Sequence, residues 1–293
     1  MRKLLFFLLV SLFFVIPAYA LDLDGLSTED IQMTRQIISK LQPVIRERDS
    51  EESLATLTFK DLDAPLTKQE KKFLKQFRNL SRKETGIKIP WRGLSTGEND
   101  LIAIKGQRVK DKVRVRKEGK LETVIVDRTL PPQYLPLTAY QKYFEMMAAM
   151  EKDIGKRLYV DSGYRSSAFQ LYLFVYYLRN HGFSVKETVR YVTLPGYSEH
   201  GDPGHQAIDF INRDGINGDP HVEEFECLPE NLWLQEHAQD FGFVLSYPRD
   251  CPDGITYEPW HWRYDPKAAR EVAKEKAPKV KTNDRLKGGT CKN

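Results

Sequence analysis

The sequence Tyr-Glu-Pro-Trp-His-Trp-Arg-Tyr, residues 257–264, predicts a β-strand with a functional histidine near its start. Pro259 cannot donate a hydrogen bond to a neighbouring strand, so it suits the entrance of a strand. Side chains then alternate between the two faces of the sheet, which places the aromatic residues on one face and His261 and Arg263 on the other. Glu258 stands three residues before His261. This pattern is also typical of an aromatic strand with one buried histidine, so its interpretation depends on a second stretch.

The second stretch is a Gly/Pro-rich loop that contains His200 and leads into the apolar run 207–211, which contains Asp209. Histidine nitrogen and carboxylate oxygen are ordinary zinc ligands, and a hydrolytic zinc site typically keeps three protein ligands and a water molecule. His200, Asp209 and His261 supply these three ligands. Glu258 supplies a carboxylate that can take a proton from the water. The sequence therefore predicts a hydrolytic site with one Zn²⁺ ion per chain.

In this order, the motifs resemble the VanY-type D-alanyl-D-alanine carboxypeptidases, zinc peptidases of the bacterial cell wall that are related in fold to the hedgehog signalling domain. The motifs that carry the resemblance are Tyr-Ser-Glu-His at 197–200, Ala-x-Asp at 207–209, Glu-Pro-Trp-His-x-Arg-Tyr at 258–264 and Val-Asp-Ser-Gly-Tyr-Arg-Ser-Ser at 160–167. Together they cover roughly residues 130–264. The resemblance implies peptidoglycan peptides as substrates and an α+β fold, in which helices pack against an antiparallel sheet that carries the zinc site.

The resemblance also implies roles for residues around the metal. Glu258 is expected to be the catalytic base, and Arg165 is expected to stabilise a developing oxyanion or to pair with a carboxylate. Four more residues are expected to shape the substrate pocket: Ser198, Gln170, Tyr164 and Trp260. Each of these four also has an ordinary structural interpretation, as a loop or helix cap or as a packed aromatic residue.

One departure from the family pattern concerns the spacing of the first two ligands. Family members usually place the aspartate seven positions after the histidine, whereas Asp209 follows His200 by nine positions. The two extra residues lie in the loop 201–204, and they create a rival ligand, His205. We favour His200 because the Tyr-Ser-Glu-His run that precedes it matches the family.

The first twenty residues predict a secretory signal peptide. Arg2 and Lys3 form a basic start, residues 4–16 are largely apolar, and Ala18-Tyr19-Ala20 is a small-x-small cleavage site. The apolar run is short for a bilayer span, and no cysteine suited to a lipid anchor follows it. We therefore expect export to the periplasm or cell envelope, cleavage after Ala20, and no membrane anchor in the mature chain.

Charge and cysteine content narrow the classes of partner. Removal of the signal peptide leaves a net charge of about +2, and no long basic stripe interleaved with aromatic residues occurs, so a nucleic-acid partner is not expected. The three cysteines are Cys227, Cys251 and Cys291. In an oxidising compartment two of them are expected to form a disulfide. Cys227 with Cys251 is the favoured pair, although Cys291 remains an alternative partner for either; the oligomeric state stays open.

The remaining sequence predicts an accessory region at residues 21–130, a catalytic domain at 131–266 that begins near a cluster of prolines, and a closing helix with a polar tail at 267–293. Hydrophobic periodicity predicts the elements of each part. Accessory helices are expected from Ser27 onward and at 67–80, with strands at 101–104, 112–116 and 121–126, the last two joined as a hairpin. In the catalytic domain, helices are expected at 138–153, 166–180, 184–192 and 229–241, and strands at 157–161, 206–211, 243–247 and 260–264.

The leading functional hypothesis is an exported zinc peptidase that removes the terminal D-alanine from peptidoglycan stem peptides. An endopeptidase that cuts D,D or L,D cross-links shares the same metal chemistry, so pocket shape decides between the two. A binding module that keeps the metal without turnover is the alternative from another class. The presence of Glu258 argues against it, because a binder needs no base. A serine-type D,D-peptidase is disfavoured because the Ser-x-x-Lys motif is missing.

Overall fold

Four antiparallel strands form the central sheet of the protein. The computed structural model describes residues 20–96, 100–117, 119–202, 204–218 and 222–268. Within them the sheet has the order β5-β6-β8-β7. Its strands are β5 (Tyr159–Ser162), β6 (Ala207–Ile211), β8 (His261–Tyr264) and β7 (Phe243–Leu245). The register places Asp209 of β6 directly opposite His261 of β8, so two side chains that are far apart in the sequence become neighbours.

Alternation along β6 and β8 separates the large apolar side chains on one face of the sheet from Asp209, His261 and Arg263 on the other. Ile208, Phe210, Trp262 and Tyr264 are buried in one hydrophobic core. The side chains between them point to the opposite face of the sheet, because successive residues of a strand face opposite ways. The expected separation of the aromatic residues from His261 is therefore confirmed for Trp262 and Tyr264.

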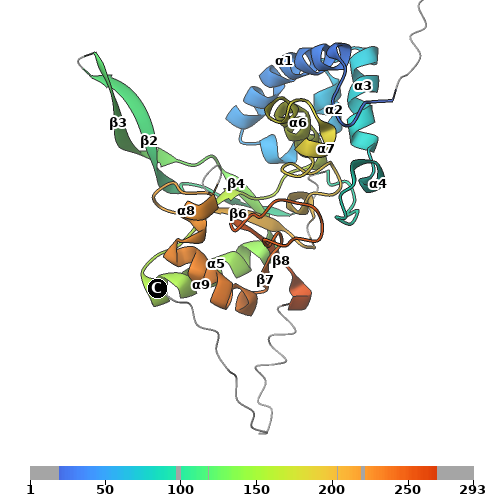
Figure 1. Ribbon diagram of the computed structural model, residues 1–293. Coiled ribbons are helices and arrows are strands. Elements are labelled where there is room, and N and C mark those ends of the chain that lie inside the picture. The colour runs from blue at the N-terminus through green and yellow to red at the C-terminus, as the bar shows by residue number, and fades with distance from the viewer. Residues whose placement is uncertain (1–19, 97–99, 118, 203, 219–221, 269–293) are drawn as a thin grey trace, which may run out of the picture.

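Helices cover the apolar face of the sheet. They are α5 (Leu137–Ile154), α8 (Val222–Glu226) and α9 (Pro229–His237), which lie together on one side of the sheet in Figure 1. Helix α5 buries three methionines, Met146, Met147 and Met150, in the same core as Trp262. Their unbranched side chains fill irregular gaps between helix and sheet. This helix-on-sheet packing confirms the expected α+β fold.

A second, helical lobe adjoins the polar side of the site (Figure 1). It contains α1 (Thr28–Ser50), α2 (Phe59–Asp63), α3 (Lys68–Asn79), α4 (Arg82–Thr85), α6 (Ser167–Tyr177) and α7 (Val185–Thr188). Ile37 and Leu41 of α1, Phe77 of α3 and Phe174 of α6 share one hydrophobic core. The N-terminal helices thus bury one side of α6. The first residue of α6, Ser167, lies close to the site.

Two further sheets each consist of two antiparallel strands. Strand β1 (Leu101–Ile104) pairs with β4 (Gln133–Pro136), and β2 (Arg108–Lys117) pairs with β3 (Lys120–Thr129) as a hairpin. Figure 1 shows this hairpin projecting from the body of the protein. The expected strands and the hairpin are confirmed. β1 lies before the boundary expected near residue 130 and β4 lies after it, so this pair connects the two expected domains. The division into two domains stays a prediction.

Several expectations have other outcomes. The helix expected at 184–192 ends earlier, since α7 stops at Thr188. Cys227 and Cys251 are both free thiols, so the favoured disulfide between them is wrong. Cys291, the signal peptide and most of the closing helix lie outside the described residues. Among the residues that are described, no helix combines the length and the apolar character that a membrane span requires.

Candidate metal centre

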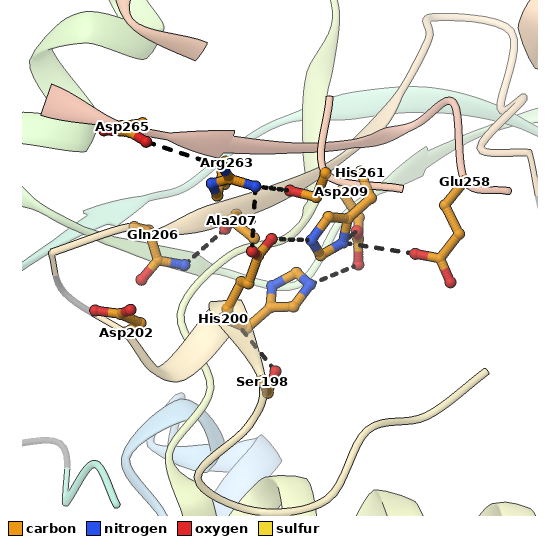
Figure 2. A network of polar contacts seen from close by, with 12 residues as sticks. Ser198, His200, Asp202, Gln206, Ala207, Asp209, Glu258, His261, Arg263 and Asp265 are labelled. Atoms are coloured by element: carbon orange, nitrogen blue, oxygen red, sulfur yellow. Dashed lines mark hydrogen bonds and ion pairs between the residues drawn. The ribbon is translucent and has the colours of Figure 1, made fainter. Parts of the chain in front are cut away.

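Three side chains converge at the polar face of the sheet, and they are the three expected ligands. His200, Asp209 and His261 each offer one ligand atom, and these atoms lie within 4.8 Å of one another. Asp209 and His261 come from adjacent strands, whereas His200 comes from the short 3₁₀ turn Glu199–Gly201. Figure 2 shows the two imidazoles and the carboxylate facing one another.

The hydrogen bonds of His200 define which of its ring nitrogens is free to bind a metal. Nδ1 lies 2.8 Å from the carbonyl oxygen of Gly163, so Nδ1 carries the proton and donates it. Burial lowers the pKa of His200 to about 4, with the nearby Arg165 charge acting in the same direction, so the ring is neutral. The lone pair of Nε2 then faces Asp209 Oδ2 at 3.1 Å, and Nε2 has no hydrogen-bond partner among the described residues. A neutral imidazole nitrogen and a carboxylate oxygen in this position can both bind one metal ion.

The buried carboxylate of Glu199 contacts the ring nitrogen of His261 that faces away from Asp209. The Nε2 of His261 lies 3.1 Å from Glu199 Oε2, and its Nδ1 lies 2.8 Å from Asp209 Oδ1. Burial opposes protonation of the ring, but the hydrogen bond and charge of Asp209 prevail and raise the pKa of His261 to about 10 in the metal-free protein. A proton therefore occupies the Nδ1 position that a metal ion would take. A histidine with a carboxylate on its far nitrogen is the usual arrangement of a zinc ligand.

The donor set fits zinc. Two imidazole nitrogens and one carboxylate oxygen are a normal three-ligand set for a catalytic zinc ion, with a fourth position left for water or substrate. Both histidines are buried, at 2% and 4% exposure, and Asp209 is half-buried. His200 Nε2 supplies the direct structural sign, because this buried nitrogen has no other partner among the described residues.

Glu258, the expected base, lies beside the three ligands. Its Oε2 is 3.7 Å from His261 Nδ1, and its side chain is 14% exposed. Burial raises the pKa of Glu258 to about 8, and the negative charge of Asp209 adds to this effect. A carboxylate with a raised pKa is suited to accept a proton and return it near neutral pH. Figure 2 shows Glu258 directed at the centre from the loop before β8.

Arg165, the expected oxyanion partner, lies on the other side of Asp209. Its Nη2 is 3.8 Å from Asp209 Oδ2, and its backbone N–H donates to the His200 carbonyl at 2.9 Å. Burial lowers the pKa of Arg165, with the Asp209 and Glu258 charges opposing the change. An arginine stays protonated in any case. The structure therefore places one permanent positive charge next to the ligands.

The four expected pocket residues have different positions. Ser198 caps the ligand turn, since its Oγ accepts from the His200 N–H at 3.3 Å. Gln170 is 2% exposed and donates to the Thr193 carbonyl at 2.7 Å, which ties α6 to the chain before the ligand loop. Tyr164 is 1% exposed and so lies in the interior rather than on a pocket wall. Trp260 packs against Phe225 and over Gly218, on the far side of β8 from the ligands.

The rival ligand His205 lies outside the cluster. Its side chain is 37% exposed, and its Nδ1 contacts Asp202 Oδ2 at 3.2 Å. The ligand group found among the described residues contains His200 and not His205. The two extra residues of the loop are accommodated between His200 and β6, which leaves the preferred ligand in place.

Sequence reasoning missed two charged residues that support the centre. Glu199 is 2% exposed, and its Oε2 contacts His261 Nε2. Arg92 Nη2 lies 2.5 Å from the other carboxylate oxygen of Glu199. The position of Glu199 inside the Tyr-Ser-Glu-His motif was an available signal. Arg92 belongs to the accessory region, where no motif distinguished it from other surface arginines.

The metal-free protein is expected to lose stability as pH rises from 7 to about 10. The folded pKa values of His261 and Glu258 lie above their ordinary values of 6.5 and 4.5, so both groups stabilise the fold at low pH and lose that contribution as pH passes about 10 and about 8. Thermal unfolding in EDTA at pH 7 and pH 9.5 measures the change. Glu258→Gln should show a smaller fall in Tm, and a flat or rising Tm of the parent protein would contradict the assignment.

Part of the chain is similar in sequence to known peptidases. Residues 133–267 match the family model described as VanY, D-alanyl-D-alanine carboxypeptidase. A D-alanyl-D-alanine carboxypeptidase of Enterococcus faecium is 30% identical over 147 residues, which are 49% of this chain and 41% of that protein. The bifunctional D-Ala-D-Ala dipeptidase and carboxypeptidase VanXYC of Enterococcus gallinarum is 39% identical over 120 residues, 39% of this chain and 57% of that protein. The chain spans about half the length of these curated relatives.

Solved structures with a similar sequence include two peptidases. The LdcB LD-carboxypeptidase is 30% identical, with a TM-score of 0.41, over 48% of this chain and 64% of that chain. The vancomycin resistance D,D-pentapeptidase VanY in complex with Zn(II) is 26% identical, with a TM-score of 0.39, over 48% of this chain and 78% of that chain.

Proposed function

We propose that this chain, which carries a domain of the VanY family over residues 133–267, is an exported zinc-dependent D-alanyl-D-alanine carboxypeptidase that acts on peptidoglycan stem peptides. The observation that carries the proposal is the convergence of His200, Asp209 and His261, with the lone pair of His200 Nε2 directed at a carboxylate oxygen. Glu258 beside them adds the proton acceptor that a hydrolase needs and a simple metal-binding module does not.

The reaction needs an activated water molecule and a protonated leaving group. A zinc ion held by the three ligands would acidify that water and polarise the peptide carbonyl. Glu258 takes the proton from the water as it attacks and returns the proton to the leaving amine of D-alanine. The position of Glu258 suits both steps, because its carboxyl group is 14% exposed and lies 3.7 Å from the ligand His261.

Arg165 stabilises the negative charge of the substrate as the carbonyl becomes tetrahedral. Its guanidinium lies 3.8 Å from Asp209 Oδ2, so its charge is adjacent to the reacting position. A planar guanidinium can form two parallel hydrogen bonds to an oxyanion or to the terminal carboxylate of the peptide. A terminal carboxylate is what distinguishes a carboxypeptidase substrate from an internal cross-link.

Export is the second part of the proposal. The basic start, the apolar run and the Ala-Tyr-Ala site within residues 1–20 support a cleaved signal peptide. Peptidoglycan lies outside the cytoplasmic membrane, so the proposed substrate and the proposed location agree. N-terminal sequencing of the mature protein from the producing cells should begin at Leu21, and a mature chain that retains residues 1–20 would contradict this part.

Mass spectrometry of purified muropeptides tests the activity. Incubation of monomeric pentapeptide fragments with the protein should remove a mass equal to one alanine, and EDTA or Glu258→Gln should abolish the loss. Splitting of cross-linked dimers with intact monomer termini would instead show an endopeptidase. Unchanged fragments in the presence of bound zinc would contradict the proposed enzyme and favour a binding module.

A further inference from the structure

A short segment of the accessory region lies along the loop that carries His200. We define this segment, residues 91–95, as the strap. The Arg92 N–H donates to the Gly196 carbonyl at 2.7 Å, and the indole of Trp91 covers Gly196 so closely that a Cβ there would come within 2.3 Å of the ring. At the other end of the loop, a Cβ on Gly201 would come within 2.8 Å of Ser95 Oγ. The strap therefore contacts the ligand loop on both sides of His200.

The strap is itself anchored to the start of α6. The Ser95 N–H donates to Ser167 Oγ at 2.8 Å, and the Ser167 N–H donates back to the Ser95 carbonyl at 3.1 Å. Ser167 directly follows Ser166, the N-cap of that helix. This reciprocal pair holds the strap against a rigid element, so the position of Arg92 is defined at both its backbone and its side chain.

The side chain of Arg92 bridges two carboxylates of the ligand loop. Its Nη2 lies 2.5 Å from Glu199 Oε1, and its Nη1 lies 3.2 Å from Asp202 Oδ2. Arg92 is 13% exposed at its side chain and Glu199 is 2% exposed, so the pair is shielded from solvent. A buried carboxylate without a compensating charge is costly, and the planar guanidinium supplies two donors in a fixed geometry.

Glu199 transmits this arrangement to the metal centre. One oxygen receives Arg92, and the other lies 3.1 Å from His261 Nε2. Arg263 adds a longer contact, at 3.5 Å from Glu199 Oε1. The carboxylate behind a ligating histidine orients the ring and raises its basicity. Arg92 thus acts on the ring orientation of His261 through one intervening side chain.

We propose that Arg92 is a positioning residue of the metal centre, and that the strap makes the accessory region an integral part of the site. The inference rests on the zinc site of the proposed function, but it does not depend on which bond is cleaved. The strap lies outside residues 133–267, which match the VanY family model, so the proposed centre draws on a segment beyond that match.

Zinc affinity of the mature chain, measured by competition with a chromophoric chelator, tests the role without any substrate. Arg92→Met should weaken zinc binding by up to about 10-fold, the lower end of the roughly 10- to 100-fold cost of losing a direct outer partner such as Glu199. Arg92→Lys should recover part of the loss, because a single ammonium cannot bridge both carboxylates. Arg48→Met is the matched control, since Arg48 pairs with Asp61 in the helical lobe, away from the site, and should leave zinc affinity unchanged.

A double-mutant cycle with Glu199→Gln separates positioning from a general loss of fold. If Arg92 acts through Glu199, adding Arg92→Met to Glu199→Gln should weaken zinc binding by much less than it does in the parent chain. Additive losses would overturn the proposal, as would wild-type zinc affinity in folded Arg92→Met. If Arg92→Met does not fold, a loss of zinc affinity in Arg92→Lys that is fully additive with the loss in Glu199→Gln would overturn it equally.

Discussion

Replacing Glu258 by glutamine should lower kcat on a D-Ala-D-Ala peptide by about 10²- to 10⁴-fold, while the protein keeps its zinc. The amide has nearly the same size as the carboxyl group, so packing is preserved, but it cannot accept the proton of the attacking water. Glu258 is not one of the three clustered ligands and lies 3.7 Å from His261 Nδ1, so metal binding should persist. Steady-state kinetics and elemental analysis of the same sample measure both quantities.

A control variant and two contradicting outcomes make the Glu258→Gln experiment decisive. Glu224→Gln, a neutralisation of an exposed carboxylate in the first turn of α8, should leave both kcat and zinc content unchanged. A Glu258→Gln enzyme that turns over at the parent rate would remove the assigned base. A variant that loses the metal as well would move Glu258 from the base to the ligand set.

The second large effect is expected from the two histidines of the extended loop. His200→Ala removes one of three protein ligands, so zinc affinity should fall by more than the roughly 10- to 100-fold that loss of an outer partner costs. Activity should fall with it. His205→Ala should keep zinc affinity near the parent value, because its side chain is 37% exposed and contacts Asp202 instead of the cluster.

The two variants are matched controls for each other, since each removes one imidazole from the same loop. Isothermal titration of the metal-free proteins with zinc gives affinity and stoichiometry in one experiment. Loss of zinc in His205→Ala with retention in His200→Ala would reverse the ligand assignment. Equal retention in both would show that neither histidine holds the metal.

The local sequence was sufficient to predict most of the elements and to name the three side chains that converge in the structure. Alternation around His261 predicted a strand with its aromatic residues on one face, and the apolar run around Asp209 predicted a second strand. Both strands are present, with Trp262 and Phe210 in the core. A side-chain period of two follows from the strand itself, so no knowledge of distant contacts was needed. The ligand residues were named because imidazole and carboxylate are the groups that zinc prefers.

Other features were decided only when the chain folded. The absence of His205 from the group formed by His200, Asp209 and His261, and the lack of a bond between Cys227 and Cys251, depend on distances that the local sequence does not determine. Burial of Tyr164 likewise follows from packing that its motif does not encode. Nor does the local sequence relate Arg92 to Glu199, which stand more than a hundred positions apart.

The sequence by itself therefore determined which groups can perform the chemistry and on which face of each strand they stand, because these properties are local. The tertiary structure alone decided which nitrogen of His200 is free, which carboxylate supports His261, and that Arg92, from a segment before β1, supplies the balancing charge. The physical reason is that hydrogen-bond direction and charge compensation in a buried site depend on distances between side chains, and those distances exist only after the two lobes have packed together.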